Sequence, residues 1–510
     1  MSTRSWRRMF SQNWQAGGLV LTGVTTVFLL FYRLPLFPAP WFDEGINLQA
    51  AKNMALRSQY ALGSGTDFRL FDPAVQTGPT VILPIALVFR WVGVGVFQGR
   101  MAVACYALAA AAVFYLLVSK VYTKGIALLG VILLILPYSS GHEPYVVMGR
   151  QVLGEVPALL FFWSGTLIWF SARQPGRWRA LAASGALWGL AMVTKVQFIL
   201  PISFTLLSFW LYGRFTRKEI GAAQVLLPLS ISASCVVAWY GYQALLMGVP
   251  GFLSRSRDLS SAGVMHLLRF SPQRIPGRVL QLLDARLAFL GVPAMAFTVA
   301  QDVVRGDART HLRVFLVTFA LVWSVWFSAF SVGWERYAFV AEAMLPIFSA
   351  ALLVELWAWA SQRQEINWCN WLTSPRCWAI GGVVVVLLLS GGMMLKRMIT
   401  SPDSGLQAFA DYLRSNVSPE VTIESWEYEL GAVTDHAYHY PPYQVTNAYT
   451  EFFFYGKLLP LGLYDVSSFH PEYIIEGSFA RKAGIYAQDI AMRGSLVVQI
   501  GEYKLYRLRP

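Results

Sequence analysis

The sequence predicts a polytopic α-helical membrane protein of about eleven transmembrane helices, followed by a small C-terminal extracytoplasmic α/β domain. The 510 residues are 56% hydrophobic and only 14% charged, whereas soluble globular proteins are about 25% charged. Apolar runs long enough to cross a membrane recur through residues 1–395. Shorter apolar segments between polar turns follow in residues 396–510 and indicate the soluble domain.

Positive charges in short loops set the predicted orientation in the cell (cytoplasmic) membrane. The net charge of +13 does not indicate a nucleic-acid partner, because the sequence has no basic, aromatic-rich nucleic-acid module. Lys and Arg gather in loops that are expected to stay in the cytoplasm, which puts the N-terminus inside and the C-terminal domain outside. These loops are 120–124, 173–179, 214–218, 305–313 and the segment that holds Arg363 and Arg376.

The apolar runs between these loops are the predicted spans, with one exception. Counting residues 79–95 as a span would move the 120–124 loop outside, so we expect a juxtamembrane or re-entrant helix there, within a first outer loop over 35–98. The basic N-terminus lacks a small-residue cleavage site and is predicted to be an uncleaved anchor. The predicted spans are 17–34, 99–119, 125–139, 152–172, 180–196, 198–213, 220–246, 285–304, 312–332, 338–360 and 377–395.

The C-terminal domain is predicted from its short patterned segments. Residues 411–414 indicate a helix, and residues 421–423 and 473–475 indicate strands. Residues 495–508 indicate a closing hairpin with its turn at Gly501. A length of about 110 residues is normal for a domain of this kind.

The acidic pair Asp43-Glu44 follows directly after the first predicted span. Polar groups at the edge of a membrane need water, a cation or a reacting group beside them, and they usually serve a function. A simpler alternative is that Asp43 caps a helix that starts at Glu44, since Asp is a common N-cap and Glu is favoured in the first turn. Both interpretations are compatible with the sequence.

Further charged residues fall on the same predicted outer side. Three carboxylates and several cations there indicate a site for an anionic substrate and a protonatable nucleophile. The carboxylates can act as a general base or hold a divalent cation, and the cations can neutralise phosphate oxygens. The residues that join Asp43 and Glu44 are Arg150, Glu155, Lys195, Arg274, Arg278 and Arg336.

Several of these residues also have a purely structural interpretation. Glu155 can pair with Arg150, because the two are close in sequence at a helix start. Lys195 can extend to the lipid headgroups, and Arg336 can anchor its helix at the interface. The conjunction of all these residues on one face favours a site.

Five motifs occur in order on the predicted outer side of residues 17–350. Their order resembles the GT-C superfamily of membrane glycosyltransferases, in its branch of protein O-mannosyltransferases and lipid A aminoarabinose transferases. Asp43-Glu44 resembles the acidic pair of that family's first outer loop, and Arg150 with Glu155 resembles its Arg-x4-Asp motif. The remaining motifs are 78–84 with 97–101, 189–195, and 335–337 with Pro346.

The resemblance implies that the protein moves a sugar from a polyprenyl-phosphate donor to an acceptor hydroxyl outside the membrane. Asp43 would be the general base of a single displacement, which inverts the anomeric centre. Glu44 and Glu155 would position the acceptor or a divalent ion. The residues implied to bind the donor phosphate are Arg150, Lys195 and Arg336, and Arg274 and Arg278 of the predicted outer loop 247–284 are further candidates.

A divalent metal ion is a candidate cofactor, because some members of this superfamily bind one. Its candidate ligands are Asp43, Glu155 and His266. Two departures from the family pattern bear on substrate and metal. Residues 75–79 lack the Lys that some relatives carry before the Pro-rich helix, and Glu155 has a longer side chain than the family's Asp.

Two other functions are compatible with the same residues. A transporter or flippase for lipid-linked sugars would bind phosphate without catalysis, but it would be expected to show internal repeats and polar residues at mid-membrane depth. A non-catalytic envelope protein could bind glycans through the aromatic-rich residues 426–443, which otherwise form the domain's core and loops. The sequence leaves the sugar open, and the acceptor can be a protein, a lipid or a glycan in contact with membrane lipids.

Overall fold

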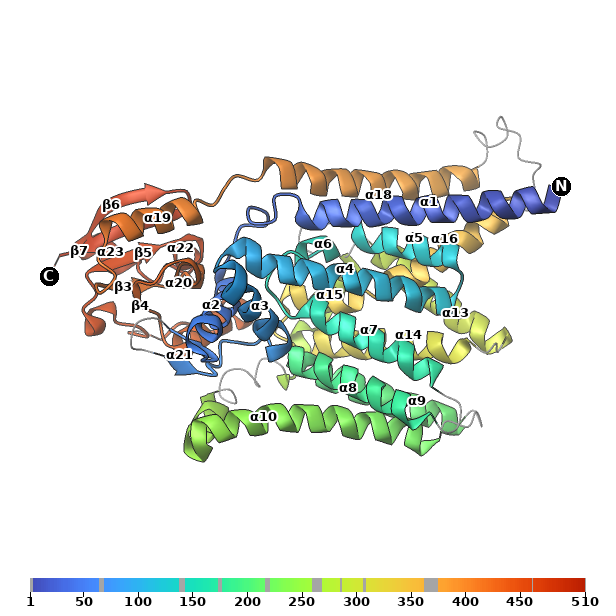
Figure 1. Cartoon of the computed structure of the whole chain (residues 1–510), viewed down its shortest axis with the longest axis horizontal. Helices are drawn as coiled ribbons and strands as arrows, with labels where there is room; N and C mark the ends of the chain where they lie inside the picture. The colour runs from blue at the N-terminus through green and yellow to red at the C-terminus, as the bar shows by residue number, and fades with distance from the viewer. Residues whose placement is uncertain are drawn as a thin grey trace.

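The computed structural model has two parts, a long helix bundle and a smaller C-terminal α/β region at one end of it (Figure 1). The N-terminus lies at the far end of the bundle from that region. This arrangement confirms the predicted fold class. The structure describes residues 3–63, 68–136, 143–172, 177–215, 221–258, 268–284, 287–305, 309–361, 375–460 and 462–509.

Apolar helices form the bundle, as expected for segments whose backbone groups must be satisfied without water. A helix lies at the position of each predicted span, and the tenth is bent into two pieces. The helices are α1 (Thr3–Phe31), α4 (Val96–Val121), α5 (Lys124–Ile135), α7 (Glu155–Ser171), α8 (Trp178–Thr194), α9 (Ile199–Phe215), α10 (Ala222–Asp258), α13 (Ala288–Arg305), α14 (Thr310–Ala329), α15 (Glu335–Glu342) with α16 (Leu345–Ser361), and α18 (Pro375–Thr400).

Length and composition alone identify some of these helices as candidate membrane spans. Within the described residues, four are long and apolar enough to cross a membrane, namely Val96–Val121, Val196–Phe215, Ala222–Arg257 and Thr310–Ala329. Two bent pairs also qualify, Pro272–Asp284 with Ala288–Asp302 and Glu335–Glu342 with Leu345–Trp359. The exact number of spans therefore stays a prediction.

The outward faces of several bundle helices are apolar. Leu21 of α1 is 68% exposed, Leu245 of α10 is 83% exposed, and Leu388 of α18 is 63% exposed. The inward faces bury large aromatic side chains, among them Trp163 and Trp323. Exposed apolar flanks around a packed interior suit a protein that faces lipid.

Two helices of the first outer loop, α2 (Phe42–Arg57) and α3 (Pro79–Val92), lie where the bundle meets the C-terminal region (Figure 1). The helix expected over 79–95 is thus confirmed as a helix. Pro79 opens it and Gly93, at a φ of 101°, ends it. The short elements are β1 (Ala61–Leu62), β2 (Arg69–Leu70), α6 (Tyr145–Met148), η1 (Val196–Phe198), η3 (Pro272–Arg274) and α12 (Ile275–Asp284).

The C-terminal region is built on a mixed five-stranded sheet in the order β4-β3-β5-β7-β6. β3 pairs in parallel with β4 and β5, whereas β7 pairs antiparallel with β5 and β6. The predicted helix, strands and hairpin are confirmed, and α18 runs on to Thr400 beyond the expected boundary at 395. The elements are α19 (Leu406–Asn416), β3 (Thr422–Ser425), α20 (Tyr428–Val433), β4 (Ala437–His439), α21 (Tyr443–Tyr455), η4 (Val466–Phe469), β5 (Tyr473–Glu476), α22 (Ser478–Ala483), α23 (Ala487–Arg493), β6 (Gly494–Ile500) and β7 (Tyr503–Leu508).

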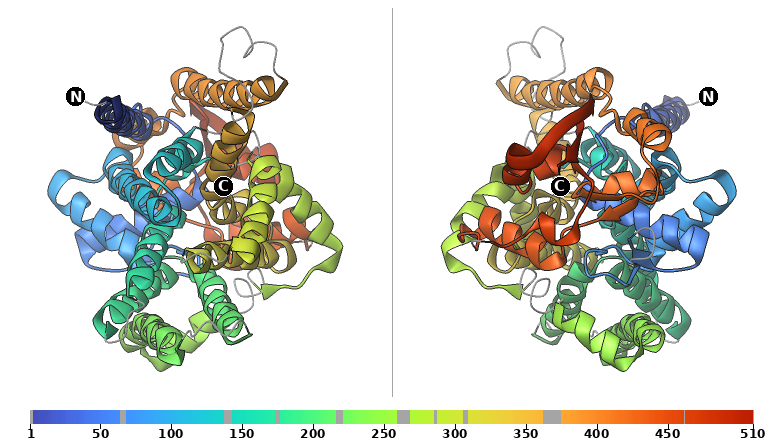
Figure 2. Two further views of the ribbon diagram at one scale, coloured as in Figure 1. Left: turned by 90° about the vertical axis from the view of Figure 1, so that its right-hand side faces the viewer. Right: turned by 90° about the vertical axis from the view of Figure 1, so that its left-hand side faces the viewer.

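Helix α2 joins the two parts by direct backbone packing against α20. A Cβ atom on Gly45 would lie 2.2 Å from the backbone nitrogen of Glu429, so only glycine permits this approach. Lys52 extends the contact by donating to the carbonyl of Gly431 at 3.0 Å and pairing with Asp435 at 2.8 Å. The C-terminal region therefore covers one end of the bundle, as the right-hand view of Figure 2 shows.

Candidate functional site

A cavity of about 720 Å³ lies between the end of the bundle and the C-terminal region. Residues of α2, α8, α10, α15, α21 and α22 line it, together with the loop over 73–78. Its volume falls within the range of small-molecule binding pockets. The lining includes the carboxylates Asp43, Glu143 and Glu335 and the cations Arg255, Arg336 and Lys482.

Asp43 lies in the first turn of α2 and reaches this cavity, with 23% of its side chain exposed. The helix begins at Phe42 after Trp41, whose side chain makes no capping hydrogen bond. The alternative in which Asp43 caps a helix that starts at Glu44 is therefore wrong. The partial positive charge of the helix N-terminus favours a carboxylate at this place.

Arg336 holds the Asp43 carboxylate. Its Nη1 atom donates to Oδ2 of Asp43. The guanidinium lies over the rings of Trp334 at 4.4 Å, Tyr337 at 5.3 Å and Trp41 at 5.6 Å. Because these rings fix its plane, Arg336 orients the carboxylate in the cavity.

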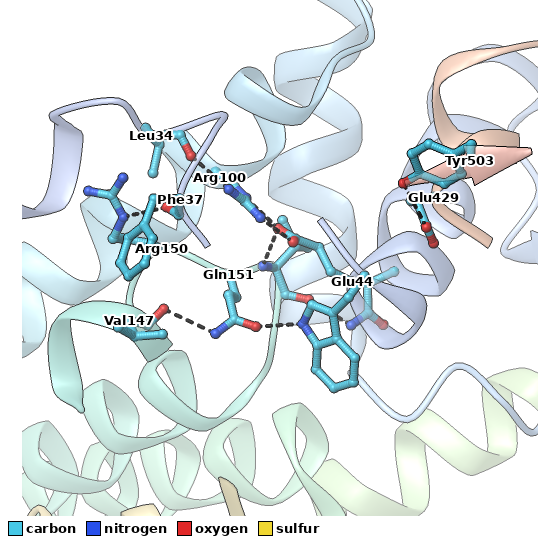
Figure 3. A network of polar contacts seen from close by, with 12 residues as sticks. Leu34, Phe37, Glu44, Arg100, Val147, Arg150, Gln151, Glu429 and Tyr503 are labelled. Atoms are coloured by element: carbon cyan, nitrogen blue, oxygen red, sulfur yellow. Dashed lines mark hydrogen bonds and ion pairs between the residues drawn. The ribbon is translucent and has the colours of Figure 1, made fainter. Parts of the chain in front are cut away.

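Glu44 faces away from the cavity, although it is the next residue. It is fully buried and accepts from Arg100 at both oxygens, from Nε at 2.7 Å and from Nη2 at 2.5 Å (Figure 3). The backbone nitrogen of Val152 also donates to Glu44, at 3.1 Å. This bidentate pair secures α2 to α4.

Arg150 is also fully buried and does not line the cavity. It donates to three backbone carbonyls at the end of α1 and just beyond it, those of Leu29 at 2.6 Å, Tyr32 at 2.8 Å and Phe37 at 2.8 Å. Figure 3 shows the contact to Phe37. Arg150, which was predicted to bind phosphate, instead stabilises the backbone at the C-terminal end of α1.

Glu155 and Lys195 form a buried ion pair of 3.0 Å, with 3% of each side chain exposed. The suggested pairing of Glu155 with Arg150 is therefore wrong, and Lys195 does not extend to the headgroups. Neither residue lines the cavity. Lys195 interacts electrostatically with Asp43 and Arg336, so this pair lies close behind the cavity wall.

The remaining predicted cations lie beside the cavity. Arg274 lies over the ring of Tyr455 at 4.9 Å. Arg278 donates to the carbonyl of Ser328 at 3.2 Å. Neither side chain lines the cavity, and His266 lies outside the described residues.

Glu143 is the cavity carboxylate that the sequence reasoning missed. Burial, with repulsion by Glu335 next, raises the pKa of Glu143 to about 7. The neighbouring Gln151 accepts from the indole nitrogen of Trp41 at 2.5 Å and also hydrogen-bonds Glu143. The signal was available, because Glu143 is the one carboxylate of the short predicted outer segment 140–151, between two apolar runs.

Two of the three predicted metal ligands are engaged by cations. Asp43 is engaged by Arg336, and Glu155 is engaged by Lys195. In the part of the chain that the structure describes, no three His, Cys, Asp or Glu side chains gather closely enough to hold an ion.

A family model and several solved structures agree with the resemblance seen in the sequence. The family model described as dolichyl-phosphate-mannose-protein mannosyltransferase matches residues 76–240. No curated protein matches the sequence. Together the fold and this family match support the resemblance to the GT-C membrane glycosyltransferases.

Solved structures of two proteins are similar to it over most of its length. ArnT from Cupriavidus metallidurans bound to undecaprenyl phosphate has a TM-score of 0.64 at 14% identity, covering 96% of this chain and 98% of ArnT. The archaeal oligosaccharyltransferase AglB from Archaeoglobus fulgidus, in complex with an inhibitory peptide and a dolichol-phosphate, has a TM-score of 0.62 at 12% identity, covering 98% of this chain and 75% of AglB. The Archaeoglobus enzyme in complex with Zn and sulfate matches with a TM-score of 0.57 at 12% identity, over 93% of this chain and 69% of that one.

Proposed function

We propose that this protein is an inverting glycosyltransferase that moves a sugar from a polyprenyl-phosphate donor to an acceptor hydroxyl on the extracytoplasmic face. Asp43 carries the proposal, because it is a carboxylate in the cavity that a helix start and Arg336 hold in place. The similar ArnT and AglB structures contain undecaprenyl phosphate and dolichol-phosphate, which supports a lipid-phosphate donor.

The chemistry is a single displacement. Asp43 takes the proton of the acceptor hydroxyl, and the acceptor oxygen forms a bond to the anomeric carbon from the face opposite the phosphate. The bond between that carbon and the phosphate oxygen breaks, and its electron pair leaves with the polyprenyl phosphate. Attack from the opposite face inverts the anomeric centre. A positioned base is needed because a neutral hydroxyl is a weak nucleophile.

Arg336 is the proposed cation for the departing phosphate. Its Nη1 atom is occupied by Asp43, but its buried Nε atom has no hydrogen-bond partner among the described residues. A guanidinium has five donors in one plane, so it can bind the base and a phosphate oxygen together. Lys195 adds positive potential from behind the wall, whereas Arg150 and Glu44 act by holding α1 and α2.

The orientation follows the charge distribution along the chain. The basic loops favour an N-terminus in the cytoplasm, and with that orientation the cavity opens on the outer side together with the C-terminal region. The acceptor is a protein, lipid or glycan that reaches the outer face.

The substitution Asp43→Asn tests the proposal. It keeps the shape of the side chain but removes the base, so transfer from a labelled polyprenyl-phosphate sugar should fall by at least about 100-fold. The exposed Asp411, which interacts with Gln407 and Arg414 of its own helix α19, gives the control Asp411→Asn. Full transfer by a folded Asp43→Asn enzyme would contradict the proposed base.

A further inference from the structure

We propose that helix α21 forms the acceptor side of the cavity and binds a neutral saccharide. This inference rests on the proposed function, because it identifies the acceptor of that reaction. The helix presents one face to the cavity, and the lining residues recur at the three- and four-residue spacing of an α-helix. They are Tyr443, Thr446, Asn447, Tyr449, Thr450, Phe453 and Phe454.

The start of α21 lies close to the proposed base. The Tyr443 side chain hydrogen-bonds Gln76 and interacts electrostatically with Asp43. Gln76 in turn accepts from the hydroxyl of Tyr337 at 3.3 Å. A ligand on this end of α21 would therefore reach the carboxylate that must deprotonate it.

The rest of this face is aromatic, and its rings pack against aromatic residues of both the bundle and the C-terminal region. Tyr449 meets Trp426 edge-on at 5.1 Å between ring centroids, and Phe454 meets Trp334 in the same way at 5.9 Å. Trp334 is the residue that also lies under Arg336. The aromatic wall is thus continuous from the C-terminal region to the pair formed by Asp43 and Arg336.

The chemistry of this face fits a sugar ring. The C–H face of a pyranose packs on an aromatic ring, and its hydroxyls need hydroxyl and amide partners, which Thr446, Asn447 and Thr450 provide. The one acidic residue of the helix, Glu451, is held outside the cavity by Arg269 at 3.0 Å and Lys457 at 2.7 Å. A face without charge favours a neutral ligand.

Two other acceptor classes fit this wall less well. An extended peptide is usually held by the main chain of a strand edge, but no strand residue among those described lines the cavity. A phosphorylated acceptor would need several cations of its own. Lys482 is the single cation that the described part of the C-terminal region supplies to the lining.

Two adjacent phenylalanines provide a matched test. Phe452 and Phe453 are both exposed, at 39% and 53%, but only Phe453 lines the cavity. Binding of neutral oligosaccharides, Ser/Thr peptides and a phosphorylated glucosamine disaccharide should be measured on the full-length protein in nanodiscs. Neutral oligosaccharides should bind the wild type and Phe452→Ala, and Phe453→Ala should weaken that binding by about tenfold or more.

This binding experiment tests the saccharide site independently of the proposed transfer reaction, since binding needs no donor and no catalytic base. Thr450→Val removes one hydroxyl with little change in shape, and it serves as a second variant if Phe453→Ala fails to fold. Binding of only the peptides or only the phosphorylated disaccharide would overturn the inference. So would equal binding by the two Phe variants, or an absence of binding by all three classes. Loss of transfer in Asp43→Asn would leave the proposed function standing in each case.

Discussion

Asp43 and Glu44 show how two adjacent carboxylates acquire different tasks. Successive residues of a helix point about 100° apart, so one can face a cavity while the next faces the bundle. Asp43 faces the cavity and Arg336, whereas Glu44 is fully buried against Arg100. The sequence predicted the pair but could not assign the tasks, because Arg100 lies 56 residues away in the chain.

Glu143 should give the enzyme a pH dependence near neutrality. Its pKa of about 7 means that it is mostly neutral at pH 6 and mostly charged at pH 8. The charged form repels a donor phosphate and competes with Asp43 for Arg336. We therefore expect the KM for the donor to rise several-fold from pH 6 to pH 8. Donor titrations of Glu143→Gln should lack this rise, and an identical profile in both proteins would contradict the assignment.

The ion pair of Glu155 and Lys195 should prove mainly structural. Removing one partner leaves a buried charge alone, so Glu155→Gln should destabilise the protein by about 3 to 5 kcal/mol. The double variant Glu155→Gln with Lys195→Met should recover much of this loss, because no charge is then left unpaired. Thermal unfolding in detergent measures the effect. A stable Glu155→Gln protein that has lost only transfer would instead indicate a direct role in catalysis.

At the scale of elements, α2 depends on contacts to both parts of the molecule. Glu44 fastens it to α4, and Gly45 lets it touch α20. The aromatic ring of Phe42 stacks on Phe479 of α22 at 4.2 Å. The position of Asp43 is therefore set by residues that lie hundreds of positions later in the chain.

Gly45→Ala tests this dependence. The added methyl group would meet the backbone of α20 and must push the two helices apart, at a cost of about 1 to 3 kcal/mol. Because Asp43 lies two residues away, we expect kcat to fall about tenfold or more. Gly23→Ala on α1 is the matched control, since a Cβ there would meet nothing within 4 Å. Equal kcat values in the two variants would show that α2 is not positioned by α20.

The helices were more predictable than the connections between them. Periodicity and length identify α3, α19 and the hairpin of β6 and β7, because each signal is local. β4 has only three residues, Ala437–His439, which are too few to show an alternating pattern. Arg150 was predicted to bind phosphate, but its partners are backbone carbonyls. Every residue has a backbone carbonyl, so the sequence gives no signal for these contacts.

At the scale of the whole molecule, the orientation in the membrane can be tested with single cysteines. In a variant that lacks Cys105, Cys235, Cys369 and Cys377, Ser418→Cys of the C-terminal region should react with an impermeant maleimide in intact cells. Lys124→Cys, in a predicted inner loop, should react only after permeabilisation. The reverse pattern would invert the topology and place the cavity in the cytoplasm.

The cavity itself could not be predicted as a whole, because its walls come from both ends of the chain. The charge pattern predicted that Asp43 and Arg336 share a face, and the structure brings them together. Nothing in the sequence indicated that α21 lies opposite them. Its aromatic residues resemble those of any domain core, and only the folded structure shows that they line the same cavity as Asp43.

The separation of these walls has a consequence for biosynthesis. Asp43 emerges from the ribosome 400 residues before Tyr443 of α21. A nascent or truncated chain without the C-terminal region lacks both α21 and the contacts that α20 and α22 make with α2. We therefore expect such a chain to be inactive, because the cavity is complete only after the C-terminal region has been synthesised.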